Sequence, residues 1–76
     1  MSHLTLYAKP GCHLCEEARD VIATVDDTLP IREVDITQDP VLTERYGLRI
    51  PVLADDAGQE IAWPFGPADV LNLLNR

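Results

Sequence analysis

The chain has 76 residues, with six Lys and Arg against thirteen Asp and Glu, which gives a formal net charge of -7. This charge repels phosphate backbones and anionic lipid surfaces, so we expect no nucleic-acid or membrane partner. The chain is 46% hydrophobic and 25% charged, which is typical of a globular protein with a real core. At this length we expect one domain, spanning residues 1–76, that buries about 60% of the surface its unfolded chain exposes.

The first residues have no basic region and no long apolar run, and no later stretch is long enough to span a bilayer. We therefore expect a monomeric, cytoplasmic protein. In that reducing compartment a close pair of cysteines is more often catalytic or metal-binding than a permanent crosslink.

Residues 3–7 are short, β-prone and bounded by a Lys-Pro-Gly sequence, which predicts a buried strand followed by a turn. From residue 14 to residue 25 apolar residues recur at helical spacing, which predicts the first helix. Residues 31–36 then suit a second strand. The apolar face of the first helix is formed by Leu14, Ala18, Val21, Ile22 and Val25.

A short second helix is predicted between an N-cap and a glycine stop. Asp39 is the N-cap, Pro40 takes the first helical position and Gly47 lies just past the end. Residues 50–54 and 60–63 are strand-like and are separated by a polar turn sequence, which predicts a hairpin.

A last helix is expected to begin at Pro67, with an apolar face of Val70, Leu71 and Leu74. The order of elements is then βαβαββα. A right-handed βαβ crossover followed by a hairpin predicts an α/β fold, a mixed four-stranded sheet flanked by helices.

The two cysteines, Cys12 and Cys15, stand where the first strand turns into the first helix. Helical positions three apart share a face and lie within disulfide reach. A disulfide closing so short a loop contributes only about 2 kcal/mol in the chain-entropy model, so a reversible redox role is the better explanation. An inert buried pair and half of a metal site are the alternatives.

A metal site within one chain lacks ligands. Structural zinc takes four protein ligands, and beyond the two cysteines only His3 and His13 are soft candidates. We therefore expect no resident metal; a zinc or iron-sulfur site within one chain and a cluster shared between two chains are the alternatives.

Residues 9–15 read Lys-Pro-Gly-Cys-His-Leu-Cys, and an Ile-Pro step at residues 50–51 precedes the third strand. Together with the βαβαββα order, these features resemble glutaredoxins, and most closely the small glutaredoxin-like proteins of the thioredoxin superfamily. The resemblance implies thiol-disulfide oxidoreductase activity on a disulfide-containing protein or a small thiol. It makes Cys12 the attacking cysteine, Cys15 the resolving cysteine, and Pro51 a cis-proline that faces them.

The same region suggests binding residues. Lys9 and His13 add positive charge beside Cys12, and Arg49 suits a substrate carboxylate. The backbone of Ile50 would pair with an extended substrate segment. A non-enzymatic redox sensor, a partner module that binds a metal or iron-sulfur cluster, and a redox-inactive scaffold are the alternatives.

The sequence departs from the glutaredoxin pattern in two places. His13 stands where glutaredoxins commonly have proline, and residues 63–69 lack the Gly-Gly pair that holds glutathione, with only Gly66 and Asp69 echoing that motif. We therefore expect no cofactor, and glutathione only as a weak reductant. Trp63 and Phe65 are expected to pack at the edge of the core.

Overall fold

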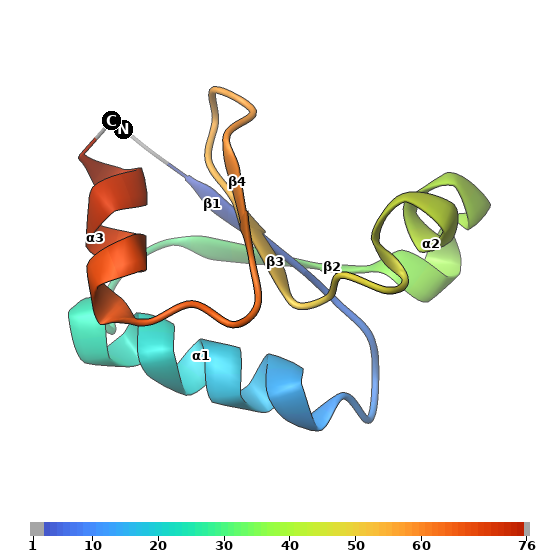
Figure 1. Cartoon of the computed structure of the whole chain (residues 1–76), viewed down its shortest axis with the longest axis horizontal. Helices are drawn as coiled ribbons and strands as arrows, with labels where there is room; N and C mark the ends of the chain where they lie inside the picture. The colour runs from blue at the N-terminus through green and yellow to red at the C-terminus, as the bar shows by residue number, and fades with distance from the viewer. Residues whose placement is uncertain (1–2, 76) are drawn as a thin grey trace.

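The computed structural model describes residues 3–75 and contains a mixed four-stranded sheet with three α-helices (Figure 1). The predicted order of elements and the α/β fold class are confirmed. The elements are β1 (Leu4–Ala8), α1 (His13–Val25), β2 (Ile31–Asp35), the 3-10 turn η1 (Ile36–Gln38), α2 (Pro40–Tyr46), β3 (Val52–Ala54), β4 (Glu60–Ala62) and α3 (Pro67–Leu74).

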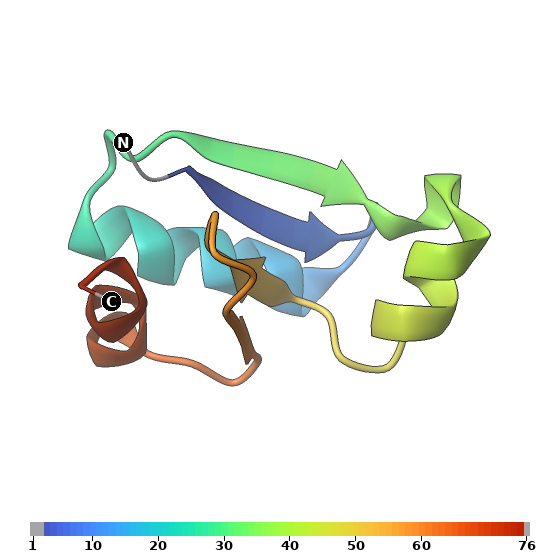
Figure 2. The same cartoon turned by 90° about the horizontal axis from the view of Figure 1, so that it is seen from above.

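The strands lie in the order β2-β1-β3-β4. β1 is parallel to β2 and antiparallel to β3, and β3 is antiparallel to β4. Figure 2 shows α1 and α3 beneath one face of the sheet and α2 beyond the carboxyl end of β2. Because β1 is a central strand that runs straight into the turn before α1, the start of that helix lies at the carboxyl end of the two parallel strands.

The larger hydrophobic cluster lies between the sheet and the helices α1 and α3. β1 supplies alternate residues to it, as expected for a strand with one face against a core. α1 supplies Ala18 and Ile22, which are four residues apart and therefore share a helix face. The buried members are Leu4, Leu6, Ala18, Ile22, Leu53, Phe65, Val70 and Leu73.

A smaller cluster lies on the opposite face of the sheet, under α2. Its buried members are Ile36, Tyr46 and Val52. The ring of Tyr46 stacks on Tyr7 with 4.3 Å between centroids, and its hydroxyl donates to Glu60. Burial, together with the Glu60 carboxylate, raises the pKa of Tyr46 to about 12.

Two apolar faces differ from the predicted ones. In α3 the buried residues are Val70 and Leu73, whereas Leu71 is 48% exposed, so the predicted face was wrong by including Leu71. Leu73 lies three residues after Val70 and so faces the core with it. At the start of α1, Leu14 is 43% exposed because the buried face of the helix follows Cys15, Ala18 and Ile22, and Leu14 lies to one side of it.

The second strand ends one residue earlier than predicted. The side chain of Asp35 accepts from the backbone N–H of Thr37 at 2.9 Å, which begins the 3-10 turn. The N-cap of α2 is confirmed, since the Asp39 carboxylate accepts from the Val41 N–H at 2.9 Å. Among residues 3–75, no helix is both long enough and apolar enough to cross a membrane.

Candidate active site

The site begins with a tight turn between β1 and α1. Gly11 has φ +73°, a left-handed conformation that glycine adopts without steric cost. Cys12 follows as the N-cap of α1, and its Sγ accepts from the backbone N–H of Cys15 at 3.2 Å. The turn therefore places one sulfur at the positive end of the helix dipole, which stabilises a thiolate.

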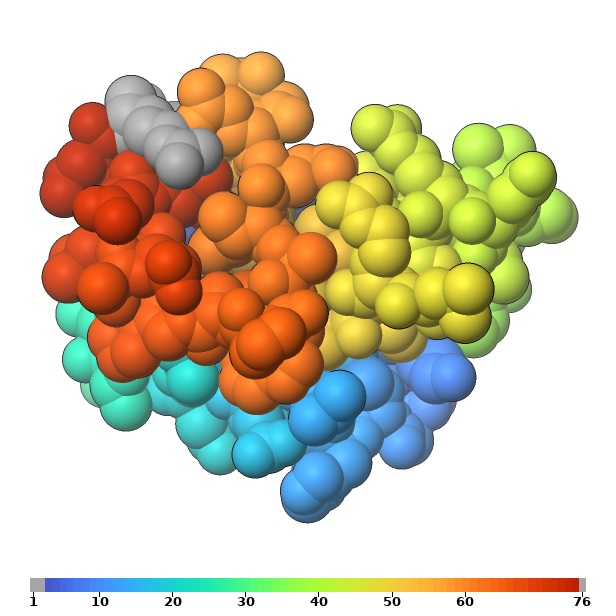
Figure 3. Space-filling model, viewed as in Figure 1, coloured from blue at the N-terminus to red at the C-terminus, as the bar shows by residue number. Residues whose placement is uncertain are grey.

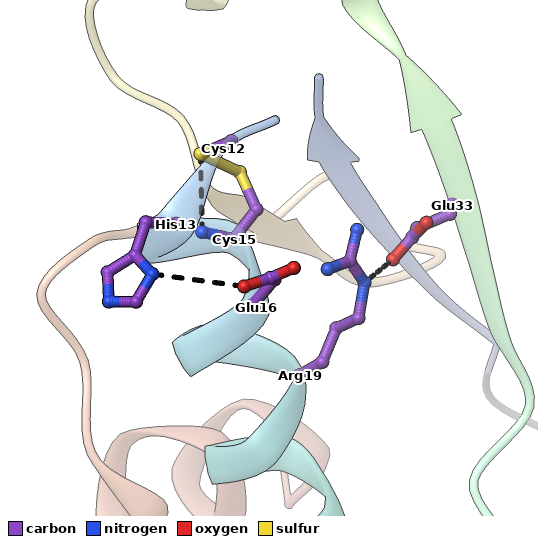
Figure 4. The surroundings of a disulfide bond; sticks show 6 residues. All are labelled: Cys12, His13, Cys15, Glu16, Arg19 and Glu33. Atoms are coloured by element: carbon purple, nitrogen blue, oxygen red, sulfur yellow. Dashed lines mark hydrogen bonds and ion pairs between the residues drawn. A yellow bond between two sulfur atoms is a disulfide. The ribbon is translucent and has the colours of Figure 1, made fainter. Parts of the chain in front are cut away.

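Cys12 and Cys15 form a disulfide, with 5.2 Å between their Cα atoms (Figure 4). Their exposure differs. Cys15 is fully buried, whereas Cys12 is partly exposed. A reagent from solvent therefore has access to the Cys12 sulfur and not to that of Cys15.

Charged side chains surround the start of α1. His13 is exposed, and its Nδ1 lies 3.8 Å from the carboxylate of Glu16. Arg19, one turn after Cys15, donates through Nε to Glu33 on β2 (Figure 4). This hydrogen bond raises the pKa of Arg19. The pairing of Arg19 with Glu33 had not been predicted, because nothing in the sequence brings together residues 14 positions apart.

Lys9 is exposed and lines a hollow of about 260 Å³ beside the turn. Arg19 and Glu33 line the same hollow, together with Asp35. Lys9 is therefore near the site, as expected for a residue three positions before Cys12.

The segment leading into β3 lies next to the start of α1, as Figures 3 and 4 both show. The Ile50-Pro51 peptide bond is cis, as the resemblance implied, and Trp63-Pro64 is also cis. The carbonyl oxygen of Pro51 accepts from the Trp63 N–H at 3.0 Å, which ties this segment to the end of β4.

The backbone of Ile50 is less available than predicted. Its N–H donates to the carbonyl oxygen of Tyr46 at 3.0 Å, closing the turn after α2. The pairing of the Ile50 backbone with a substrate segment stays a prediction, and the Ile50 N–H already has an internal acceptor. A substrate segment can use that donor only by displacing Tyr46.

Arg49 already has a carboxylate partner. Its Nη2 lies 3.8 Å from the Glu60 carboxylate, and its guanidinium lies 5.8 Å from the centre of the Tyr46 ring. A substrate carboxylate would have to compete with Glu60 for this side chain.

The start of α3 offers few donors for an anion. The Gly66 N–H donates to the Asp69 carboxylate at 2.8 Å, and the Asp69 N–H donates to the Gly66 carbonyl oxygen at 3.1 Å. Pro67 has no N–H. Just before this helix, Phe65 is buried and Trp63 packs edge-to-face on it with 5.2 Å between centroids, which confirms that both pack at the core.

No group of three or more His, Cys, Asp and Glu side chains within residues 3–75 is arranged to hold a metal ion. Together, the mixed sheet and the cysteine pair at the start of α1 define a small glutaredoxin-like protein of the thioredoxin superfamily.

The chain belongs to the family of the glutaredoxin-like domain (DUF836), whose model matches residues 3–75. It is similar to the target protein XcR50 from X. campestris at 39% identity, covering 95% of both chains with a TM-score of 0.87 for the X-ray structure. For the solution structure of XcR50 the TM-score is 0.85, with 95% of this chain and 91% of that one covered. Protein Ne2328 from Nitrosomonas europaea is 28% identical, with 93% and 87% covered and a TM-score of 0.78.

Proposed function

We propose that the protein is a thiol-disulfide oxidoreductase that reduces disulfides through Cys12 and Cys15. The observation that carries this proposal is the asymmetry of the pair. Cys12 is partly exposed and its sulfur accepts an N–H at the helix start, whereas Cys15 is fully buried one turn inside the helix. This arrangement suits an attacking thiolate and an internal resolving thiol.

The reduced pair would act in two exchanges. The Cys12 thiolate attacks one sulfur of a substrate disulfide, and the other sulfur leaves as a thiolate that takes up a proton. Cys15 then loses its proton and attacks the Cys12 sulfur, which releases the second substrate thiolate. Two electrons pass to the substrate, and the protein is left with the disulfide seen in the structure. A thiol donor must return these electrons, which fits a reducing compartment such as the cytoplasm.

Trapping of the mixed disulfide tests the two roles. Cys15→Ser keeps the attacking sulfur and removes the resolving one, so it should accumulate a covalent adduct with a small dialkyl disulfide. Cys12→Ser should form none. Mass spectrometry of the two variants after the same exposure decides the assignment, and equal trapping by both would refute it. Thiols that fail to cycle, or an iron-sulfur absorbance in the purified protein, would instead favour a scaffold or a cluster-binding module.

We propose that glutathione binds weakly and is a poor donor. Holding its carboxylates needs free N–H groups or basic side chains. The N–H groups of Gly66 and Asp69 already donate hydrogen bonds within the chain, and Arg49 is paired with Glu60. One missing charge-assisted contact costs about 1.5 to 3 kcal/mol, or at least about tenfold in affinity.

Titration calorimetry of the Cys15→Ser variant with reduced glutathione measures this binding directly. We expect a dissociation constant in the range of about 1 mM or weaker. Tight binding that is lost in Lys9→Ala or Arg49→Ala would show that the missing glycines do not matter.

A further inference from the structure

The outer edge of β2 is open. β2 is the first strand of the sheet order, and within residues 3–75 Figure 2 shows no helix or strand beyond it. The Leu4 N–H donates to the Pro30 carbonyl oxygen at 3.3 Å, and Leu4 is in register with Ile31. In a parallel ladder, alternate residues direct both main-chain groups to the neighbouring strand. Arg32 therefore faces β1, whereas Ile31 and Glu33 direct their N–H and C=O groups outward.

A hollow of about 360 Å³ adjoins this edge on the face covered by α1. It is lined by apolar residues and by three charged ones, which are Leu6, Ile22, Ala23 and Ile31 and Arg19, Asp27 and Glu33. A lysine or arginine side chain suits such a space, because its aliphatic stem lies on apolar atoms while the cation reaches Asp27; the Glu33 carboxylate already accepts from Arg19.

A second hollow, of about 480 Å³, adjoins the same strand and is lined by Thr5, Arg32 and Asp56. Arg32 alternates with Ile31 and Glu33 along β2, so its side chain lies on the other face of the sheet. Side chains of an added strand also alternate between faces. Successive residues of a bound segment would therefore meet one hollow and then the other, which is how strand addition achieves specificity.

A second copy of the chain fits this edge poorly. A symmetric antiparallel pair of β2 strands keeps each residue opposite one on the same face. Three such registers overlap three or more residues of β2. They place Glu33 opposite Glu33, Arg32 opposite Arg32, and Glu33 opposite Asp35, respectively. Like charges directly opposite destabilise a strand pair, and each copy carries a net charge of -7.

A different, basic chain is complementary. On the α1 side the edge has three carboxylates, Asp27, Glu33 and Asp35, against the two cations Lys9 and Arg19, so it carries a net negative charge within a chain of net charge -7. We propose that the outer edge of β2 binds an extended segment of a partner protein in which basic and apolar residues alternate, with the basic side chains on the α1 face. This docking surface adjoins the hollow beside the cysteine turn, and binding there does not depend on the redox activity of the cysteine pair.

A cysteine-free hexapeptide that alternates lysine with valine, blocked at both ends, is a suitable probe for the oxidised protein. Nuclear magnetic resonance titration should show saturable binding, with the largest amide shifts and new protection from hydrogen exchange at Ile31 and Glu33. The peptide that alternates glutamate with valine should bind at least about tenfold more weakly, because it brings like charge to the edge.

Two substitutions at one position separate main-chain pairing from charge. Glu33→Ala and Glu33→Pro both remove the carboxylate, but only proline removes the outward N–H, which the ladder to β1 does not use. We expect the proline variant to bind the lysine peptide about fivefold to tenfold more weakly than the alanine variant. Circular dichroism establishes that each variant is folded.

Equal affinity of the two variants would overturn the proposal, as would amide shifts centred away from β2 or no saturable binding. If Glu33→Pro does not fold, the amide mapping on the unmodified chain decides alone. Sedimentation that shows a dimer, with the same β2 amides protected, would assign the edge to a second copy and would also overturn it.

Discussion

The register of α3 makes a sharp prediction, because two leucines two positions apart have opposite environments. Leu73 is 2% exposed and belongs to the larger cluster, whereas Leu71 is 48% exposed. Replacing a buried leucine by alanine costs about 2 to 5 kcal/mol, and we expect about 3 kcal/mol for Leu73→Ala because α3 can shift slightly toward α1. Leu71→Ala should change the free energy of unfolding by no more than about 0.5 kcal/mol.

The loss at Leu73 is large for this protein. A domain of 76 residues is expected to be stable by about 4 to 11 kcal/mol, so the substitution removes a substantial fraction of the total. Urea unfolding followed by the fluorescence of Trp63, the single tryptophan, measures both variants in the same oxidised state. Equal losses, or a larger loss for Leu71→Ala, would refute the observed register and favour the face predicted from the sequence.

Two further predictions concern the smaller cluster and the turn before the cysteines. The phenol of Tyr46, with its pKa raised to about 12, should stay neutral through the range in which the unfolded chain ionises, near pH 10. The contribution of this shift to the free energy of unfolding is therefore complete below about pH 10 and is lost as the pH rises through about 12. In a pH titration of the folded protein, the phenolate absorbance should rise in a step near pH 12 that is absent from Tyr46→Phe. Gly11→Ala should cost about 1 kcal/mol in urea unfolding, because alanine is strained at φ +73°, and an unchanged midpoint would contradict this.

Local patterns were sufficient to predict most of the fold. The spacing of apolar residues identified α1, and the capping residue Asp39 with the following proline located α2. The same reasoning could not choose the face of α3, because Val70, Leu71, Leu73 and Leu74 cover more than one face. Only packing against α1 decides which of them is buried.

Features of the site that depend on residues close together in the sequence could be predicted. Features that depend on contacts between residues far apart in the sequence could not. The exposure of Cys12 and the burial of Cys15 follow from their positions at the helix start. The bond from the Ile50 N–H to Tyr46 depends on how the backbone turns after α2, and side-chain types do not encode that turn directly. The pairing of Arg19 with Glu33 requires the βαβ crossover to be complete.

The two hydrophobic clusters give the two sides of the candidate site unequal local stability. α1, which carries Cys15, is anchored in the cluster of eight buried residues, whereas α2 and the segment leading to Pro51 rest on the cluster of three. Segments with fewer buried contacts open locally at lower free energy, so amide hydrogens in α2 should exchange faster than those in the middle of α1. The segment leading to Pro51 can therefore loosen and re-form while the helix that holds the sulfurs stays in place.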